Sequence, residues 1–198
     1  LPADVSWGEG GVACPPPPAP SPAVADDACV SAIAEVIRSG RKAALLLGGR
    51  ALRETDLLAA ARIAEHSGIK LLAEVFPTRL QRGAGLPAVE RIAYMAEMAG
   101  VQLAEIEELI LVDAKAPVSF FAYPGKKSYL VPDGCNVRTL ATPEQNTTAS
   151  LDKLAAALGA GHIQPKLQAA QRPGRPRGRL TAAKVCKAVG HLMPENAI

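Results

Sequence analysis

Apolar residues along the chain alternate between helical spacing and short continuous runs. The first helical segment begins at Asp26 or Asp27 and ends before Gly40, with apolar positions at Val30, Ile33, Ala34 and Ile37. Residues 43–47 form a continuous run of alanine and leucine, which is typical of a parallel strand covered on both faces. The pattern therefore predicts a helix followed closely by a buried strand.

The same alternation continues as far as residue 160. Further helices are predicted at residues 54–66, 89–99 and 147–159, the last beginning at Thr147 or Thr148. Further strands are predicted at residues 69–73, from 108 or 109 to 112, and at 136–140. Strands that alternate with helices over short connections form right-handed βαβ units. The predicted fold class is therefore α/β: an open, doubly wound, mostly parallel Rossmann-like sheet with helices on both faces.

Composition changes on both sides of this segment. Residues 14–22 contain six prolines, a density that favours an extended spacer and excludes a helix. After Gly161 the chain becomes basic, with a short amphipathic helix predicted at about residues 180–192. We expect three parts: residues 1–25 as the end of a preceding domain and a linker, 26–160 as the α/β domain, and 161–198 as a basic linker with a final helix. Because the chain opens at Leu1 rather than Met, we expect a piece of a longer protein.

Charge and cysteine patterns argue against several function classes. Much of the excess in the net charge of +3 lies between Lys166 and Arg179, a segment without acidic or aromatic residues. Nucleic-acid-binding segments normally interleave basic and aromatic residues, so we interpret this one as a solvated linker and expect no nucleic-acid partner. The four cysteines lie far apart without metal-ligand spacing, which indicates reduced thiols in the cytoplasm. No apolar stretch is long enough to span a bilayer, so no membrane partner is expected.

The candidate chemistry lies where the predicted strands end, because open α/β sheets bind ligands at that edge. Gly48 and Gly49 follow the first strand, so their backbone N–H groups would either approach a phosphate or only form a tight turn. The tight turn is favoured, since the third glycine of G-x-G-x-x-G is missing. Arg79 and Arg82, in the loop after the second strand, would contact an anionic group, form salt bridges or remain in water. If a nucleotide binds, the candidate cofactor-binding set is Gly48, Gly49, Arg50 and Arg79.

Residues 113–132 form a loop that is long for a compact domain and holds most of the chain's aromatic residues: Phe120, Phe121, Tyr123 and Tyr129. Such loops are usually functional or packed against another part of the protein, and packing at a domain interface is the favoured interpretation. The histidines are scattered and have no neighbouring nucleophile or carboxylate that suggests a relay. We therefore predict no catalytic residue and no metal ligand.

Several segments resemble the central domain of thiamine diphosphate-dependent decarboxylases and carboligases. Residues 43–52 (AALLLGGRAL) resemble its first strand and turn. Residues 109–118 (LILVDAKAPV) and 120–132 resemble the G-A-P-V-F-x-Y … Y-L-x-P-G region of benzoylformate decarboxylase-like enzymes, and residues 76–87 resemble the matching part of acetolactate synthase large subunits. The opening LPADV resembles the L-P-x-D-V end of the family's pyrimidine-binding domain. These resemblances follow the family's order over most of residues 1–160.

The resemblance implies an architecture of three α/β domains, with the thiamine cofactor between the first and third, usually across a dimer interface. The family's catalytic glutamate lies in the pyrimidine-binding domain, and its G-D-G … N-N motif, which holds Mg²⁺ and the diphosphate, lies in the diphosphate-binding domain. Neither is found in this sequence, and residues 193–198 resemble the lead into the third domain. The resemblance thus implies that this chain is the central structural domain of a 2-oxo acid decarboxylase or carboligase. It also implies that the chain alone is inactive and that the parent protein is a dimer or tetramer.

Some members of this family hold a nucleotide in the central domain: FAD in acetolactate synthase and pyruvate oxidase, ADP in oxalyl-CoA decarboxylase. Acetolactate synthase typically has three consecutive glycines after the first strand, whereas here Arg50 follows Gly48 and Gly49 and would crowd that site. The Gly-Met-rich flavin loop is also missing at residues 82–87. FAD is therefore disfavoured. Two other hypotheses stay open: a nucleotide-binding module for FAD, NAD or ADP at the Gly48-Gly49 turn, and an interaction module whose basic tail binds an acidic partner.

Overall fold

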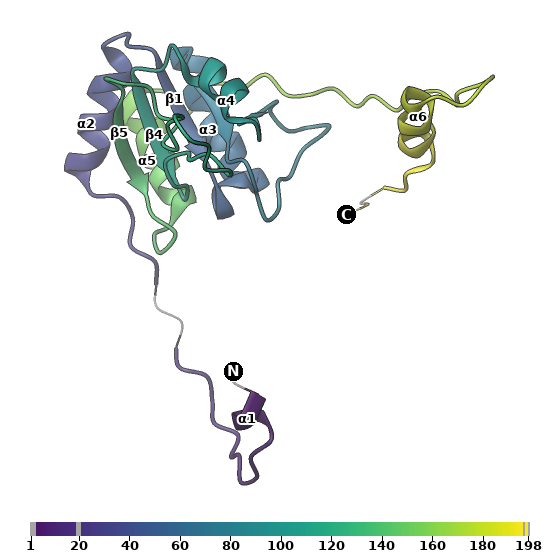
Figure 1. The fold of residues 1–198 in the computed structure, drawn as a ribbon. Helices are drawn as coiled ribbons and strands as arrows, with labels where there is room; N and C mark the ends of the chain where they lie inside the picture. Colours follow the sequence, from purple (N-terminus) through teal and green to yellow (C-terminus); the bar gives the residue numbers. More distant parts are fainter. Residues whose placement is uncertain (1–2, 19–20, 196, 198) are drawn as a thin grey trace.

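Five parallel strands form one open sheet in the order β3-β2-β1-β4-β5 (Figure 1). They are β1 (Ala43–Leu47), β2 (Lys70–Ala73), β3 (Glu90–Arg91), β4 (Glu108–Val112) and β5 (Asn136–Ala141). Leu45 in the central strand lies opposite Leu71 of β2 and Ile110 of β4. The predicted α/β class is confirmed, and every strand pair is parallel. This computed structural model describes residues 3–18, 21–195 and 197, so parts of the predicted N-terminal segment, proline-rich linker and C-terminal lead-in lie outside the described residues.

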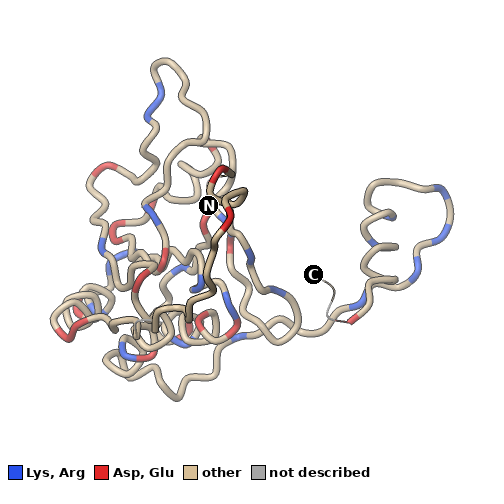
Figure 2. Tube along the Cα trace, turned by 90° about the horizontal axis from the view of Figure 1, so that it is seen from below, with Lys and Arg blue, Asp and Glu red and all other residues tan. Residues whose placement is uncertain are grey.

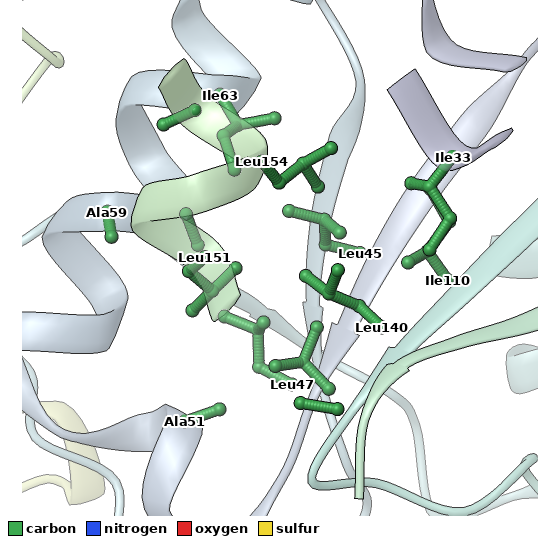
Figure 3. Packing of buried hydrophobic residues seen from close by; sticks show 14 of the residues in the cluster. Ile33, Leu45, Leu47, Ala51, Ala59, Ile63, Ile110, Leu140, Leu151 and Leu154 are labelled. Atoms are coloured by element: carbon green, nitrogen blue, oxygen red, sulfur yellow. The ribbon is translucent and has the colours of Figure 1, made fainter. Parts of the chain in front are cut away.

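Both faces of the sheet are covered, as the continuous apolar runs predicted. Alternate residues of β1 and β4, including Leu45, Leu47 and Ile110, pack on one side against α2 (Asp27–Arg38), α3 (Glu54–Ser67) and α5 (Thr147–Leu158). Figure 3 shows this layer, with Leu151 and Leu154 of α5 beside Leu45 and Leu47 of β1. The intervening residues, such as Leu46 and Leu109, face the second core, which contains Ala99 and Leu103 of α4 (Ala96–Leu103).

The helix ends follow from the capping residues. The Asp26 carboxylate accepts a hydrogen bond from the Cys29 backbone N–H at 2.6 Å, so α2 begins where the sequence predicted. The Asn146 side chain caps α5 in the same way, by accepting from Ala149. Gly68 ends α3 in the left-handed conformation, with φ 74°. These residues set where α2 and α5 begin and where α3 ends.

The helix predicted at residues 89–99 is wrong. Glu90 and Arg91 instead form the short edge strand β3, which pairs with Leu72 and Ala73, and the helix begins only at Ala96. Val89 and Ile92 have the spacing of one helix face. In the structure, however, the Ile92 N–H donates to the Ala73 carbonyl of β2, and the Ile92 side chain is buried against the sheet. Backbone pairing with β2 therefore overrides the local pattern. The helix also continues through Gly100, because Leu103 is buried against the second core.

The two ends of the chain extend away from the sheet layers (Figure 1). The N-terminal end carries the four-residue helix α1 (Ala3–Ser6), which buries no residue. At the other end, Gln168 exchanges backbone hydrogen bonds with Gly85 and Leu86, beyond which the chain leads to α6 (Ala182–Leu192). This helix matches the predicted tail helix. Between Lys166 and Glu195 the chain has seven Lys or Arg residues and one acidic residue (Figure 2). No helix among the described residues is both long and apolar enough to cross a membrane.

A buried carboxylate connects three segments at the amino end of the sheet. Glu108 is fully buried and accepts hydrogen bonds from Arg41 (2.5 Å), Asn136 (2.8 Å) and Arg138 (3.0 Å). Burial alone would raise the pKa of Glu108, but the hydrogen bonds from the asparagine and the two arginines outweigh burial and leave the pKa below its ordinary value. The charged form is therefore the stable form in the folded protein.

We expect Glu108→Gln to lower the free energy of unfolding by about 2 kcal/mol near neutral pH, because the amide cannot replace the charge-assisted bonds. A folded pKa below the unfolded value of 4.5 gives stability that is complete above pH 4.5 and is lost as the pH falls through the folded pKa. The gap between wild type and variant should therefore close on acidification, as measured by urea unfolding over a pH series. The control is Glu107→Gln at an exposed neighbouring position. A gap that is constant with pH would contradict this role of the charge.

Candidate functional site

The sheet has its switch point between β1 and β4, since the chain proceeds to β2 and β3 on one side of β1 and to β4 and β5 on the other. Ligands of open α/β sheets bind in the crevice at such a point, outside the carboxyl ends of the strands. A cavity of about 650 Å³ lies there. It is lined by Leu46, Gly49, Glu74, Val75, Phe76, Ile92, Tyr94, Asp113, Ala114, Lys115, Pro117, Val118, Ser119, Phe120 and Pro143.

The backbone donors of the Gly48-Gly49 turn already have acceptors. The N–H of Gly48 donates to the Val112 carbonyl at 3.0 Å. The N–H of Gly49 donates to Oε1 of Glu74 at 3.0 Å, and the N–H of Arg50 donates to Oδ2 of Asp113 at 2.7 Å. A nucleotide phosphate would need these same groups. Two carboxylates therefore occupy the position where a dinucleotide-binding turn would receive an anion.

The two glycines make this arrangement possible. A Cβ on Gly48 would overlap the backbone oxygen of Asp113, and a Cβ on Gly49 would overlap the Asp113 carboxylate. Gly49 also has φ 43°, in the left-handed region that favours glycine. In this structure the glycine pair thus allows the segment after β4 to approach the end of β1.

Three of the four predicted cofactor-binding residues, Gly48, Gly49 and Arg50, lie together at the switch point. The Arg50 guanidinium extends to the carbonyl oxygens of Pro143 and Gln145 in the loop after β5, and its Nε lies 3.9 Å from Oδ2 of Asp113. Arg79 is exposed and does not line the cavity. The structure therefore joins the glycine turn to the loops after β4 and β5, and leaves Arg79 apart.

Sequence reasoning missed the two carboxylates. Glu74 directly follows β2 and Asp113 directly follows β4, so both lie at the carboxyl edge of the sheet. Their position in the sequence, one residue beyond each buried strand, could have indicated that both carboxylates lie at this edge. Asp113 has φ 48°, a left-handed conformation that is uncommon outside glycine, although aspartate adopts it more readily than most residues. Such backbone outliers are concentrated at functional sites.

Aromatic rings from three loops form the outer wall of the cavity. Phe76, Tyr94 and Phe120 pack together with centroid separations of 5.3–5.7 Å, and all three line the cavity. Phe121 and Tyr123 extend this aromatic cluster away from the cavity. All five rings are exposed to solvent to at least 42%. The loop of residues 113–132 thus gathers aromatic residues as the sequence suggested, while its packing against another domain stays a prediction.

The cysteines of the chain do not line the cavity. Cys29 donates its thiol to the Thr139 carbonyl, and burial, followed by the nearby charge of Asp26, raises the pKa of this thiol. Burial is also the main cause that raises the pKa of Cys135. A raised thiol pKa lowers the thiolate fraction at neutral pH and so disfavours nucleophilic chemistry. All four cysteines are free.

Over all 198 residues the chain is 48% identical to a protein of Mycobacterium tuberculosis (strain ATCC 25618 / H37Rv) named "Putative acetolactate synthase large subunit IlvX". The chain spans 38% of that protein's length and is therefore homologous to part of it. No protein-family model matches the chain. Among solved structures, that of "a putative thiamin diphosphate-dependent enzyme isolated from Mycobacterium smegmatis" is similar in fold, with a TM-score of 0.62. The match covers 96% of this chain and 39% of that enzyme's chain. At 17% identity this likeness shows the fold alone. The predicted resemblance to acetolactate synthase large subunits is confirmed.

Proposed function

We propose that this chain, homologous to part of an acetolactate synthase-like protein, is the central structural domain of a thiamine diphosphate-dependent enzyme that acts on 2-oxo acids. The observation that carries the proposal is the 48% identity over the whole chain with 38% of the relative. In this role the domain braces a pyrimidine-binding and a diphosphate-binding domain of the same parent, which bind thiamine diphosphate and Mg²⁺. The cofactor supplies the electron sink for decarboxylation, and this chain contributes no bond-making residue.

Two features of the described residues support a bracing role. The backbone N–H groups of Gly49 and Arg50 bind the carboxylates of Glu74 and Asp113, so these donors stabilise the fold and are not free for a ligand. The exposed aromatic cluster presents apolar surface of the kind that usually packs against another part of a protein. The proposal includes a dimeric or tetrameric parent. It also includes a cytoplasmic location, which the four free cysteines favour.

The hypothesis of a nucleotide-binding module for FAD, NAD or ADP remains as the second candidate, because a cavity lies at the switch point where such cofactors bind. Its test is the thermal stability of the chain with each nucleotide. A ligand at 100 times its Kd adds roughly 2.7 kcal/mol, which is a readily measured shift. The bracing proposal expects no shift with any of the three, since the phosphates would meet two carboxylates.

We expect the 198-residue chain to bind no thiamine diphosphate and to release no CO₂ from a 2-oxo acid when the cofactor and Mg²⁺ are added. A chimera in which this chain replaces the homologous segment of the Mycobacterium tuberculosis relative should bind the cofactor with the affinity measured for the relative itself. Calorimetric titration with thiamine diphosphate and Mg²⁺ measures cofactor binding by the chain, by the relative and by the chimera. Cofactor binding or turnover by the chain alone would overturn the proposal, and a folded chimera that has lost cofactor binding would contradict the bracing role.

A further inference from the structure

We propose that the switch-point cavity binds a small organic cation, an amine carried on an aromatic or branched apolar body, in place of a phosphate-bearing nucleotide. This site goes beyond the bracing role and does not depend on it. Its volume of about 650 Å³ lies within the range typical of small-molecule sites. Three observations carry the proposal: the charge at the inner end, the aromatic rings of the outer wall and the backbone of Asp113.

The inner end of the cavity is acidic and has spare acceptors. Oε1 of Glu74 and Oδ2 of Asp113 accept backbone hydrogen bonds, whereas the second oxygen of each carboxylate accepts none from the described residues. No fully buried side-chain oxygen of the described part of the chain lacks a partner, so these second oxygens are not fully buried. The Asp113 side chain is only 8% exposed, which weakens screening by water. An ammonium group here would be attracted by both carboxylates, and a phosphate would be repelled.

The outer wall suits the apolar body of the same ligand. Phe76, Tyr94 and Phe120 bring three mutually packed rings to the cavity, and Leu46 and Ile92 form part of its apolar lining. Aromatic faces attract organic cations as well as apolar groups. Lys115, the basic residue in the lining, is exposed and forms no ion pair with the described residues. Arg50 lies 3.9 Å from Oδ2 of Asp113, so Glu74 is the carboxylate that no basic side chain of the described residues pairs.

The backbone of Asp113 holds its carboxylate in place. Its φ of 48° is an unfavourable conformation for a residue with a side chain, and neighbouring groups stabilise it: the Arg50 N–H bonds the carboxylate, and the Ala141 carbonyl accepts from the Asp113 N–H at 2.9 Å. An acid fixed in this way does not have to reorganise when a cation binds. The geometry thus pre-forms the inner end of the site.

The test is calorimetric titration of the 198-residue chain with three probes: 2-phenylethylamine, its neutral analogue 2-phenylethanol, and ADP. We expect the amine to bind at least about tenfold more tightly than the alcohol, because the alcohol lacks the charge that pairs with the two carboxylates. ADP should give no binding heat. Equal affinities for amine and alcohol, no detectable amine binding at millimolar concentration, or ADP binding tighter than the amine would each overturn the proposal.

Two variants assign the binding to the carboxylates. In the double variant Glu74→Gln with Asp113→Asn, each amide oxygen still accepts its backbone hydrogen bond, and asparagine tolerates positive φ, so the fold should persist. The affinity for the amine should fall to that for the alcohol. The matched control is Asp133→Asn, an exposed acid in the same loop that pairs with Lys127. Unchanged amine affinity in the folded double variant, or an equal loss in the control, would show that the cavity acids do not hold the cation.

Discussion

Gly48→Ala is expected to lower the free energy of unfolding by about 3 kcal/mol or more, because the new Cβ would overlap the Asp113 carbonyl oxygen and lie 3.1 Å from Cα of Ala114. Both obstacles are backbone atoms, and the Gly48 N–H is bonded to Val112 of the same segment. The clash can be relieved only by separating the carboxyl ends of β1 and β4. For a protein of this size the loss corresponds to a fall in Tm of roughly 6–12 °C.

Differential scanning calorimetry of two comparison variants separates this effect from the general cost of replacing a glycine. Gly161→Ala introduces a Cβ that meets no atom within 4 Å and should change Tm little. Gly49→Ala should have an intermediate effect, because its Cβ would meet only side-chain atoms of Asp113. Displacing them costs the hydrogen bond from Arg50 but does not require β1 and β4 to separate, and φ 43° adds strain. A Gly48→Ala protein as stable as the Gly161→Ala protein would show that β1 and β4 do not require this close approach.

Leu45→Ala is expected to have the second large effect, about 3–4 kcal/mol of unfolding free energy. Leu45 is fully buried in the central strand, between Leu71 and Ile110, and belongs to the core under α5 (Figure 3). The neighbouring strands and helix are held by their own packing and cannot collapse into the space of the lost side chain. Urea unfolding should show a lower midpoint with an unchanged slope.

The matched control is Leu180→Ala, which removes the same atoms from a leucine that is 73% exposed. It should change the unfolding free energy by less than about 0.5 kcal/mol. A loss at Leu45 as small as that at Leu180 would mean that the core between β1 and α5 is loosely packed, against the burial of the leucines in this layer.

The parts of the fold that could be predicted are those in which local pattern and tertiary packing agree. The apolar run at Ala43–Leu47 forms a strand with the predicted bounds, since a strand buried on both faces needs apolar residues throughout. Asp26 and Gly68 fix helix ends by interactions within a few residues. The edge strand β3 could not be predicted, because two residues carry no periodicity and their partners, Leu72 and Ala73, are distant in sequence.

The candidate site was predictable in position but not in chemistry. The glycine pair after β1 correctly indicated the switch-point edge, yet the same pair fits an anion or a carboxylate from the protein itself. Which of the two approaches the turn depends on how the segments after β2 and β4 fold back, a tertiary property. The aromatic wall was likewise only partly visible, because Phe76 and Tyr94 join Phe120 from separate loops.

The aliphatic core has a practical consequence for experiments on this protein. All seven aromatic residues, from Trp7 at 81% exposure to Tyr94 at 42%, lie at the surface. Intrinsic fluorescence and near-ultraviolet dichroism will therefore report on the aromatic cluster, on Tyr129 and on the chain's N-terminal end, while the interior is optically silent. A change in either signal on mixing with another molecule would indicate contact at that surface, and loss of the packed interior has to be followed through the backbone.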